Sequence, residues 1–475
     1  MMKKYDIIVI GGGVGGLSCG AFLAKRGKKV ILLEKNQNLG GYQTTFRRKG
    51  FIFEPCLHVM VEAGPDGLLL PLFNELGIEL QFIRLNPIAH FIFPDDNIFV
   101  PSQYNEYMDF LKTKFPKEVK GIEEVFILMK GIYEGLSKPS GTDALIKEYR
   151  KKVFLEILNS HIHDQRLQAI IFGYGAYFIY PPSRISATLL SAFNASAYFK
   201  GVYLPCGGVK KLVDSLAVNI EYFGGEIRKN SPVHAIMINQ GKVVGVVLQS
   251  GEKICADYVV SNIDARTTFF NMVGEKYLPS NFINQINQIK PAHSAFNVFL
   301  GVKNERLHLK NSGEPIFVFS NYNLDNQFQA MLKGDIENAN FCIGIPSRIN
   351  PFMAPEGHDI IIIYVPVPYR IDKIDWREKK FEYTERIINL ANRVIPGLKN
   401  NIVIAEAATP ETLVRYTGNS DGAVGGWSFT PEVELFRPCN KTPIEGLFLA
   451  GHWTFPGPGI GNVLTSGYIT ASMIL

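Results

Sequence analysis

Short apolar runs that end in glycine clusters or in a charged residue recur along the chain and predict strands of a parallel sheet. The first run, residues 7–10, leads into a cluster of glycines, and apolar residues then recur at helical spacing until Gly27, which is well placed to end a helix. A second apolar run, residues 30–33, ends in Glu34. The order strand, turn, helix, strand predicts the first unit of a nucleotide-binding sheet.

The glycine turn carries the spacing of a dinucleotide fingerprint. Gly11, Gly13 and Gly16 satisfy G-x-G-x-x-G, in which glycines allow a tight turn, a close approach of the backbone to a pyrophosphate and close packing of helix on strand. Glu34 follows Gly16 by 18 residues, where a carboxylate can bind a ribose hydroxyl and would repel a 2′-phosphate. The alternative is a glycine-rich loop without a ligand.

Later features favour FAD over NAD. Gly40 and Gly41 provide a second close approach of the backbone beside the first turn. A predicted helix at residues 209–223 follows the pair Gly207-Gly208, and predicted strands follow at residues 231–238, 243–248 and 254–260. The chain then returns with a strand at residues 447–450 and a helix from about residue 461 onward, whose positive N-terminal end can face the pyrimidine edge of a flavin.

Composition narrows the class of protein without identifying its substrate. The 475 residues are 46% hydrophobic and 20% charged, which is ordinary for a globular protein, and a net charge of +5 without a dense basic block does not suggest a nucleic-acid partner. The six cysteines lie far apart without a C-x-x-C pair, which predicts reduced thiols in a cytosolic protein. No signal peptide fits ahead of Tyr5, and the apolar runs are too short to predict a spanning helix.

Several stretches resemble the flavoprotein family of bacterial phytoene desaturases, plant carotenoid isomerases and retinol saturases. The N-terminal stretch IVIGGGVGGLSCGAFLAKRGKKVILLEKN is shared by many FAD proteins, including amine oxidases. The stretches LPCGGVKKLVDSL, ADYVVSNIDA and GLFLAGHWTFPGPGIGNVLTSG are more discriminating. Together with LGGYQTTFRRKGFIFEP and ATPETLVRYTGNSDGAVGGW, the matching stretches span most of the chain.

The resemblance implies an α/β fold in which a Rossmann-like FAD-binding domain, of the glutathione-reductase or amine-oxidase type, carries an inserted α+β substrate domain. The FAD-binding domain would comprise residues 1–75, 205–270 and 401–475, with the flavin beside the last segment. The substrate domain would comprise residues 76–204 and 271–400.

The resemblance also implies which residues lie at the cofactor. The glycine turn and Glu34 would hold the ADP half, Gly40 and Gly41 would lie by the pyrophosphate, Val233 near the adenine, and residues 451–461 by the flavin. The residues expected at FAD are Gly11, Gly13, Val14, Gly15, Gly16, Glu34, Lys35, Gly40, Gly41, Tyr42, Val233, Gly451, His452, Gly459, Gly461, Asn462 and Val463. Two positions depart from the family pattern: His452 stands where many relatives place an acid, and Cys56-Leu57-His58 replaces a glycine-containing turn.

Catalytic and metal-binding groups are weakly indicated. Glu54 and His58 are candidates for an acid or base near the flavin, although structural hydrogen bonding accounts for both, because a flavin can itself accept a hydride. His161 and His163 could be taken as a metal-binding pair, but further ligands at suitable spacing are missing from the sequence, so we expect an exposed, unliganded pair and no metal.

The middle of the chain is rich in aromatic residues. Residues 154–203 contain ten aromatic and five charged residues, and the basic residues Lys147, Arg150, Lys151 and Lys152 precede them. This composition predicts an apolar tunnel or a membrane-dipping entrance for a long apolar substrate; the alternative is an ordinary domain core.

Three functions remain open at this point. The favoured one is an FAD-dependent desaturase, saturase or cis–trans isomerase that acts on a polyene or another long lipid by hydride exchange at flavin N5, in the cytoplasm and peripherally bound to the inner face of a membrane. Because a second dinucleotide fingerprint is missing from the sequence, a quinone is the expected electron acceptor. The alternatives are an amine-oxidase-like enzyme for a small polar substrate and a non-catalytic prenyl- or lipid-binding protein of related fold. The oligomeric state is open.

Overall fold

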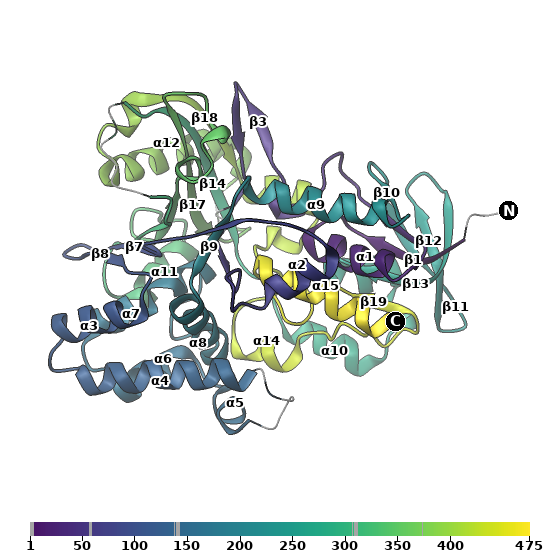
Figure 1. Cartoon of the computed structure of the whole chain (residues 1–475), viewed down its shortest axis with the longest axis horizontal. Helices are drawn as coiled ribbons and strands as arrows, with labels where there is room; N and C mark the ends of the chain where they lie inside the picture. The colour runs from purple at the N-terminus through teal and green to yellow at the C-terminus, as the bar shows by residue number, and fades with distance from the viewer. Residues whose placement is uncertain are drawn as a thin grey trace.

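Two seven-stranded sheets organise the molecule (Figure 1). The computed structural model describes residues 4–56, 59–136, 138, 143–305, 307, 312–372 and 374–475. His58 therefore lies outside the described residues.

The first sheet is the predicted nucleotide-binding sheet. Its strands run in the order β10 (Glu226–Arg228), β2 (Val30–Leu33), β1 (Lys4–Ile10), β13 (Lys253–Ser261), β12 (Lys242–Leu248) and β11 (Val233–Asn239), and β19 (Leu447–Leu449) also pairs with β13. β10, β2, β1, β13 and β19 are parallel, whereas β11 and β12 form an antiparallel hairpin beside them. The strands come from the three chain segments that the sequence assigns to the FAD-binding domain.

One face of this sheet is covered by helices from all three segments. The helices are α1 (Val14–Lys25), α2 (Leu69–Leu76), α9 (Gly208–Tyr222) and α15 (Ile460–Ile474). Their apolar side chains share one buried cluster with Ile7 and Val9 of β1. The expected end of α1 is also confirmed, because Gly27 has a φ of +78° and its N–H donates to the carbonyl oxygen of Ala24.

The second sheet belongs to the inserted part of the chain. Its order is β18 (Ile402–Ala408), β14 (Ser294–Lys303), β17 (His358–Val367), β16 (Phe341–Gly344), β15 (Ile316–Val318), β7 (Ala89–Ile92) and β8 (Asn97–Val100). The position of β18 corrects the predicted domain boundary. The sequence places residues from 401 onward in the FAD-binding domain, but β18 is the edge strand of the second sheet. The register with β14, from Asn297 opposite Ala408 to Val302 opposite Ile402, holds β18 there.

Alternate residues of the second sheet face different partners, as the two-residue period of strands requires. Phe296 and Val298 of β14 and Ile363 of β17 pack on α12 (Trp376–Val394). Phe299 of β14 and Ile362 of β17 belong instead to the large cluster that includes Phe51 and Phe53. The second sheet is therefore buried on both faces. α12 covers one face, and the N-terminal segment around Phe53 together with the segment around Tyr174 covers the other.

A group of helices extends from the second sheet. It comprises α3 (Tyr104–Lys114), α4 (Val119–Leu136), α5 (Ala144–Tyr149), α6 (Phe154–His161), α7 (Gln165–Phe172) and α8 (Ala187–Ala195), at the lower left of Figure 1. Of the ten aromatic residues at 154–203, seven are buried and the other three are half-buried. These rings therefore pack in the interior, and a membrane-dipping surface would have to be built from other residues.

The remaining elements connect these parts. They are the hairpin β3 (Phe46–Arg48) and β4 (Phe51–Phe53), the small sheet of β5 (Met60–Val61), β9 (Val202–Pro205) and β6 (Phe82–Arg84), and the helices α10 (Ser280–Gln288), α11 (Leu324–Leu332), α13 (Pro410–Thr417) and α14 (Pro431–Phe436). Among the helices of the described ranges, none is both long and apolar enough to cross a bilayer.

Candidate active site

The glycine turn after β1 has the close packing that the sequence predicts. Gly11 has a φ of +96°, and a Cβ on Gly16 would lie 2.2 Å from the carbonyl oxygen of Gly11, so both positions require glycine. Gly13 precedes α1 in an extended conformation. The first turn of α1, from Val14 onward, presents backbone N–H groups that have no acceptor within the helix, together with the positive end of the helix dipole. This arrangement suits a pyrophosphate.

The second glycine pair lies against the first turn, as expected. The N–H of Gly40 donates to the carbonyl oxygen of Gly12 at 2.7 Å, and Gly40 forms a parallel bridge with Gly13. A Cβ on Gly41 would lie 3.5 Å from the Cα of Gly13. Tyr42 follows, and its hydroxyl donates to the carbonyl oxygen of Ala423 at 3.0 Å.

Glu34 lies at the end of β2 with its carboxylate beside the glycine turn. Its Oε2 accepts a hydrogen bond from the N–H of Gly12 at 2.7 Å, and its Oε1 accepts one from the N–H of Asn36 at 2.8 Å. Each carboxylate oxygen can accept further hydrogen bonds, so ribose hydroxyls can still bind there. The carbonyl of Glu34 accepts from the N–H of Ser231, two residues before Val233, which begins β11.

The C-terminal return brings Gly451 to the glycine turn. A Cβ on Gly15 would lie 2.7 Å from the Cα of Gly451 and 2.6 Å from Oδ1 of Asn262. Asn262, at the end of β13, donates from Nδ2 to the carbonyl oxygen of Gly11 at 3.2 Å. Sequence reasoning missed Asn262. Its position after a parallel strand of a nucleotide-binding sheet was the available signal, because ligands bind at the carboxyl ends of such strands.

The helix α15 begins directly after Gly459, whose φ is +104°. Asn462 in its first turn donates from Nδ2 to the carbonyl oxygen of Pro458 at 2.7 Å, and Val463 is buried against the first sheet's cluster. A Cβ on Gly461 would lie 3.3 Å from the side chain of Leu69. Lys35 lies further out, where its Nζ donates to the carbonyl oxygen of Arg415 at 3.2 Å.

His452 lies in a site that favours its neutral form. Burial, with a further contribution from the charge of Arg437, lowers the pKa of His452 to about 4. Nη1 of Arg437 donates to the backbone carbonyl oxygen of His452 at 3.1 Å. Burial also lowers the pKa of Arg437, to about 10, so its guanidinium stays charged at neutral pH. Arg437 was not singled out from the sequence, and it places one positive charge beside the segment expected at the flavin.

These close approaches satisfy the requirements of an extended dinucleotide. The backbone at Gly13, Gly15 and Gly451 leaves no room for side chains, the acid Glu34 lies at the strand tip, and the N-terminal ends of α1 and α15 flank the turn. The residues present therefore fit such a cofactor.

Glu54 directly follows β4, and its carboxylate lies at the N-terminal end of α9. Its Oε1 accepts a hydrogen bond from the N–H of Val209 at 2.9 Å, and a Cβ on Gly208 would lie 2.7 Å from the same oxygen. Burial raises the pKa of Glu54 to about 7, while the hydrogen bond from Val209 opposes the rise. The second candidate acid or base, His58, lies outside the described residues.

The thiol of Cys56 and the hydroxyls of Tyr42, Tyr177 and Tyr364 are neutral at pH 7. Burial raises the pKa of Cys56, which follows β4, to about 12, and it also raises the pKa values of Tyr42, Tyr177 and Tyr364. The Cys56 thiol contributes to the rise at all three tyrosines, so these groups share one environment.

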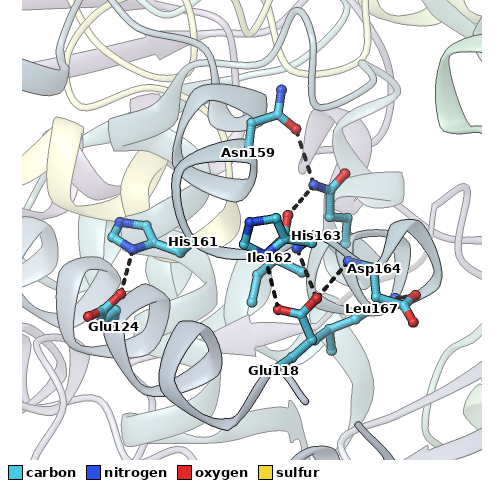
Figure 2. A network of polar contacts seen from close by, with 9 residues as sticks. Glu118, Glu124, Asn159, His161, Ile162, His163, Asp164 and Leu167 are labelled. Carbon is cyan, nitrogen blue, oxygen red and sulfur yellow. Dashed lines mark hydrogen bonds and ion pairs between the residues drawn. The ribbon is translucent and has the colours of Figure 1, made fainter.

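His161 and His163 bind different glutamates (Figure 2). Nδ1 of His161 lies 3.0 Å from Oε2 of Glu124, and Nδ1 of His163 lies 3.7 Å from Oε2 of Glu118. His163 is exposed, as expected, but His161 is partly buried. Within the described residues, His, Cys, Asp and Glu side chains form no group of three that could hold a metal ion.

Comparisons with known proteins identify relatives along the whole chain. The pattern of the family described as flavin containing amine oxidoreductase matches residues 14–475. Prolycopene isomerase of Daucus carota is 28% identical over 99% of this chain and 80% of its own. The neurosporene-forming phytoene desaturase of Rhodobacter capsulatus is 26% identical over 98% and 93%. The structure of putrescine oxidase bound to putrescine matches with a TM-score of 0.70 at 15% identity, over 99% of each chain, which shows the shared fold.

A methyl group at Gly13 should weaken cofactor binding. Alanine adopts the backbone conformation of Gly13 (φ −72°) without strain, but its Cβ would lie 2.9 Å from Nδ2 of Asn262 and where a pyrophosphate approaches the backbone. We expect Gly13→Ala to bind flavin at least about tenfold more weakly, measured by titrating the apoprotein with FAD. The matched control is Gly20→Ala in the same helix, whose Cβ meets a methyl group of Ile220 at 3.0 Å and should leave binding unchanged. Equal flavin affinity in the two variants would place the cofactor elsewhere.

Glu54 should make stability depend on pH. Its pKa is about 7 in the folded chain against an ordinary 4.5, so the folded state retains a proton that the unfolded state has released between these values. Stability should therefore fall as the pH rises from about 4.5 to about 7, by up to about 3 kcal/mol. We expect Glu54→Gln to reduce this slope, measured as the thermal unfolding midpoint of the flavin-loaded protein from about pH 5 to about pH 8. An unchanged slope would show that Glu54 is ionised throughout.

Proposed function

The chain belongs to the family of flavin-containing amine oxidoreductases, and within this family of FAD-dependent enzymes we propose that it acts on a long apolar polyene or lipid. The reaction would be desaturation, saturation or cis–trans isomerisation. The observation that carries the proposal is the buried apolar face of the second sheet opposite α12, whose β14 end packs through Phe299 on Phe46 and Phe53 of the FAD-binding domain. The printed names of the relatives, a prolycopene isomerase and a phytoene desaturase, support the same substrate class.

Different segments of this chain would bind different parts of the cofactor. Bound FAD supplies hydride exchange at its N5 atom. The turn from Gly11 to Gly16, with the helix end of α1, would bind the pyrophosphate, and Glu34 would bind the ribose hydroxyls. Gly451 and the N-terminal end of α15 would lie beside the isoalloxazine ring, where the positive end of the helix stabilises negative charge.

The face of the second sheet suits an apolar substrate. Phe317 of β15 contacts three other aromatic rings, with centroid distances of 5.6 Å to Phe91, 5.6 Å to Tyr174 and 6.1 Å to Tyr177. These packed rings make the interior on this side of the sheet apolar, which suits an apolar substrate bound next to it and excludes water.

The titratable groups that line this region also favour an uncharged substrate. Tyr42, Tyr177, Tyr364 and Cys56 have ordinary pKa values above 7 that burial raises further, and burial lowers the pKa of His452 to about 4, so all five are neutral at pH 7. The nearby carboxylate of Asp264 accepts hydrogen bonds from the N–H groups of Thr267 and Ser420. An ammonium group in this region would lose its hydration and meet mainly neutral groups, which disfavours a small cationic amine as substrate.

The flavin spectrum should respond to polyenes. We expect anaerobic mixing of the oxidised enzyme with polyenes, retinoids and unsaturated lipids to bleach the flavin if the reaction is desaturation. Reoxidation of the chemically reduced enzyme by the same compounds would indicate saturation. A change of double-bond geometry that leaves the reduced flavin intact would indicate isomerisation. Simple amines are the matched control, and bleaching by an amine alone would overturn the proposed substrate class.

We also propose that the enzyme docks peripherally on a membrane, from which it would draw its substrate and reach a quinone as electron acceptor. Ile127 of α4 is 69% exposed and Leu136 at the end of the same helix is 52% exposed. The exposed basic residues Lys147 and Lys151 lie on and after α5, which packs on α4 through Leu145. Exposed aliphatic side chains beside basic ones suit an anionic lipid surface.

Replacing Ile127 should weaken membrane binding. We expect the protein to float with phosphatidylserine-containing vesicles at low salt, and Ile127→Ser to reduce the bound fraction severalfold because it removes apolar area. Phe381→Ser is the matched control: Phe381 is 77% exposed on α12, which lies at the upper left of Figure 1, away from α4 at the lower left. Wild-type protein that stays in the soluble fraction, or equal loss in both variants, would contradict docking through α4.

A further inference from the structure

A continuous row of side chains crosses the second sheet on the face opposite α12. Residues that are directly paired in neighbouring strands lie on the same face of a sheet. Following the pairs from β18 to β8, the row consists of Ala408, Asn297, Tyr364, Cys342, Phe317, Phe91 and Ile98.

The row contacts the N-terminal segment that carries the glycine turn. Nδ2 of Asn297 donates to the carbonyl oxygen of Pro55 at 2.9 Å, directly between Glu54 and Cys56. Burial raises the pKa of Tyr364 well above its ordinary value, with smaller contributions from the Cys56 and Cys342 thiols. The phenol of Tyr364 is therefore protonated at neutral pH and can donate a hydrogen bond.

Two polar atoms in this row have no hydrogen-bond partner among the described residues. They are Oδ1 of Asn297, a residue that is 0% exposed, and the hydroxyl of Tyr364, which is also buried. The hydrogen bond to Pro55 fixes the orientation of the Asn297 amide, since only its nitrogen can donate to a carbonyl. The row thus offers one free acceptor and one free donor from directly opposite residues of β14 and β17.

The chemistry of this pair selects among apolar molecules. A hydroxyl group placed between the two side chains can donate to Oδ1 of Asn297 and accept from the hydroxyl of Tyr364. A carbonyl group would satisfy Tyr364 alone, and a pure hydrocarbon would leave both atoms unpaired, which is unfavourable for buried polar groups.

We propose that Asn297 and Tyr364 bind a hydroxyl group of the substrate, so that the enzyme acts on a polyene alcohol in preference to the corresponding hydrocarbon. The inference rests on the proposed function and adds the polar group that this site recognises. Asn297 and Tyr364 are specificity-determining residues: they fix the position of the substrate's alcohol, and thereby the part of its chain that lies beside the flavin.

The test compares matched alcohols and hydrocarbons on the flavin-loaded protein. The probes are all-trans-retinol and its counterpart with CH₃ in place of CH₂OH, and lycopene and its tertiary monohydroxy derivative. Dissociation constants are measured by quenching of tryptophan fluorescence. We expect the wild-type protein to bind at least one alcohol about tenfold or more tightly than its hydrocarbon, the ratio expected from satisfying buried polar atoms.

Tyr364→Phe removes a hydroxyl that has no partner among the described residues, so the variant should fold as well as the wild type. We expect it to lose most of the preference for the alcohol while its affinity for the hydrocarbon stays the same. The matched control is Tyr107→Phe, which removes another buried hydroxyl on α3, beside Tyr198 and outside the row, and should leave the preference unchanged.

Three outcomes separate the inference from the proposed function. Equal affinities for alcohol and hydrocarbon in the wild type, as expected if a water molecule pairs with both residues, would overturn the inference alone. A preference that survives Tyr364→Phe, or is lost equally in Tyr107→Phe, would also overturn it. Failure of every polyene to bind would instead refute the proposed substrate class.

Discussion

The close packing of α1 on α15 holds the two halves of the cofactor site together. A Cβ on Gly467 of α15 would lie 2.5 Å from the carbonyl oxygen of Gly15, and the hydroxyl of Ser18 donates to the carbonyl oxygen of Leu464 at 2.8 Å. Side chains at these positions would push the helices apart. Because the helices touch through their backbones, Gly451 and the N-terminal end of α15 reach the glycine turn, although more than 400 residues separate the partners of the Ser18 bond.

The same principle of close backbone approach recurs on the other side of the turn. Gly40 bridges Gly13, and Asn262 fills the space between the turn and Gly451 with a polar side chain that hydrogen-bonds the carbonyl of Gly11. Three chain segments therefore form one cofactor site. A long, extended cofactor needs a site of this kind, because its two ends contact parts of the fold that no single segment could supply.

Burial shifts the pKa values of the titratable groups around the cofactor site. His452, Tyr177 and Cys56 are each neutral at pH 7 because the surrounding protein disfavours their charged forms, whereas Arg437 stays charged beside the His452 carbonyl. The thiol and hydroxyl groups of Cys56, Tyr177 and Tyr364, which share one environment near the second sheet, are consequently uncharged at pH 7. Oδ1 of Asn297 and the hydroxyl of Tyr364 have no partner among the described residues and belong to directly opposite residues of β14 and β17, so a ligand that pairs with both would be favoured there.

The sequence by itself determined the nucleotide-binding sheet, the glycine turn, Glu34 at the tip of β2, the return of the C-terminal helix and the FAD-protein resemblance. These features follow from local patterns: apolar periodicity specifies strands and helices, and glycines mark positions where the backbone leaves no room for a side chain. The tertiary structure alone decided that β18 joins the second sheet, that Asn262 and Arg437 border the expected cofactor segments, and that the aromatic residues of the middle segment are internal. It also placed Asn297 opposite Tyr364. Strand register and the loss of water around a particular atom depend on contacts between distant segments, which local patterns do not encode.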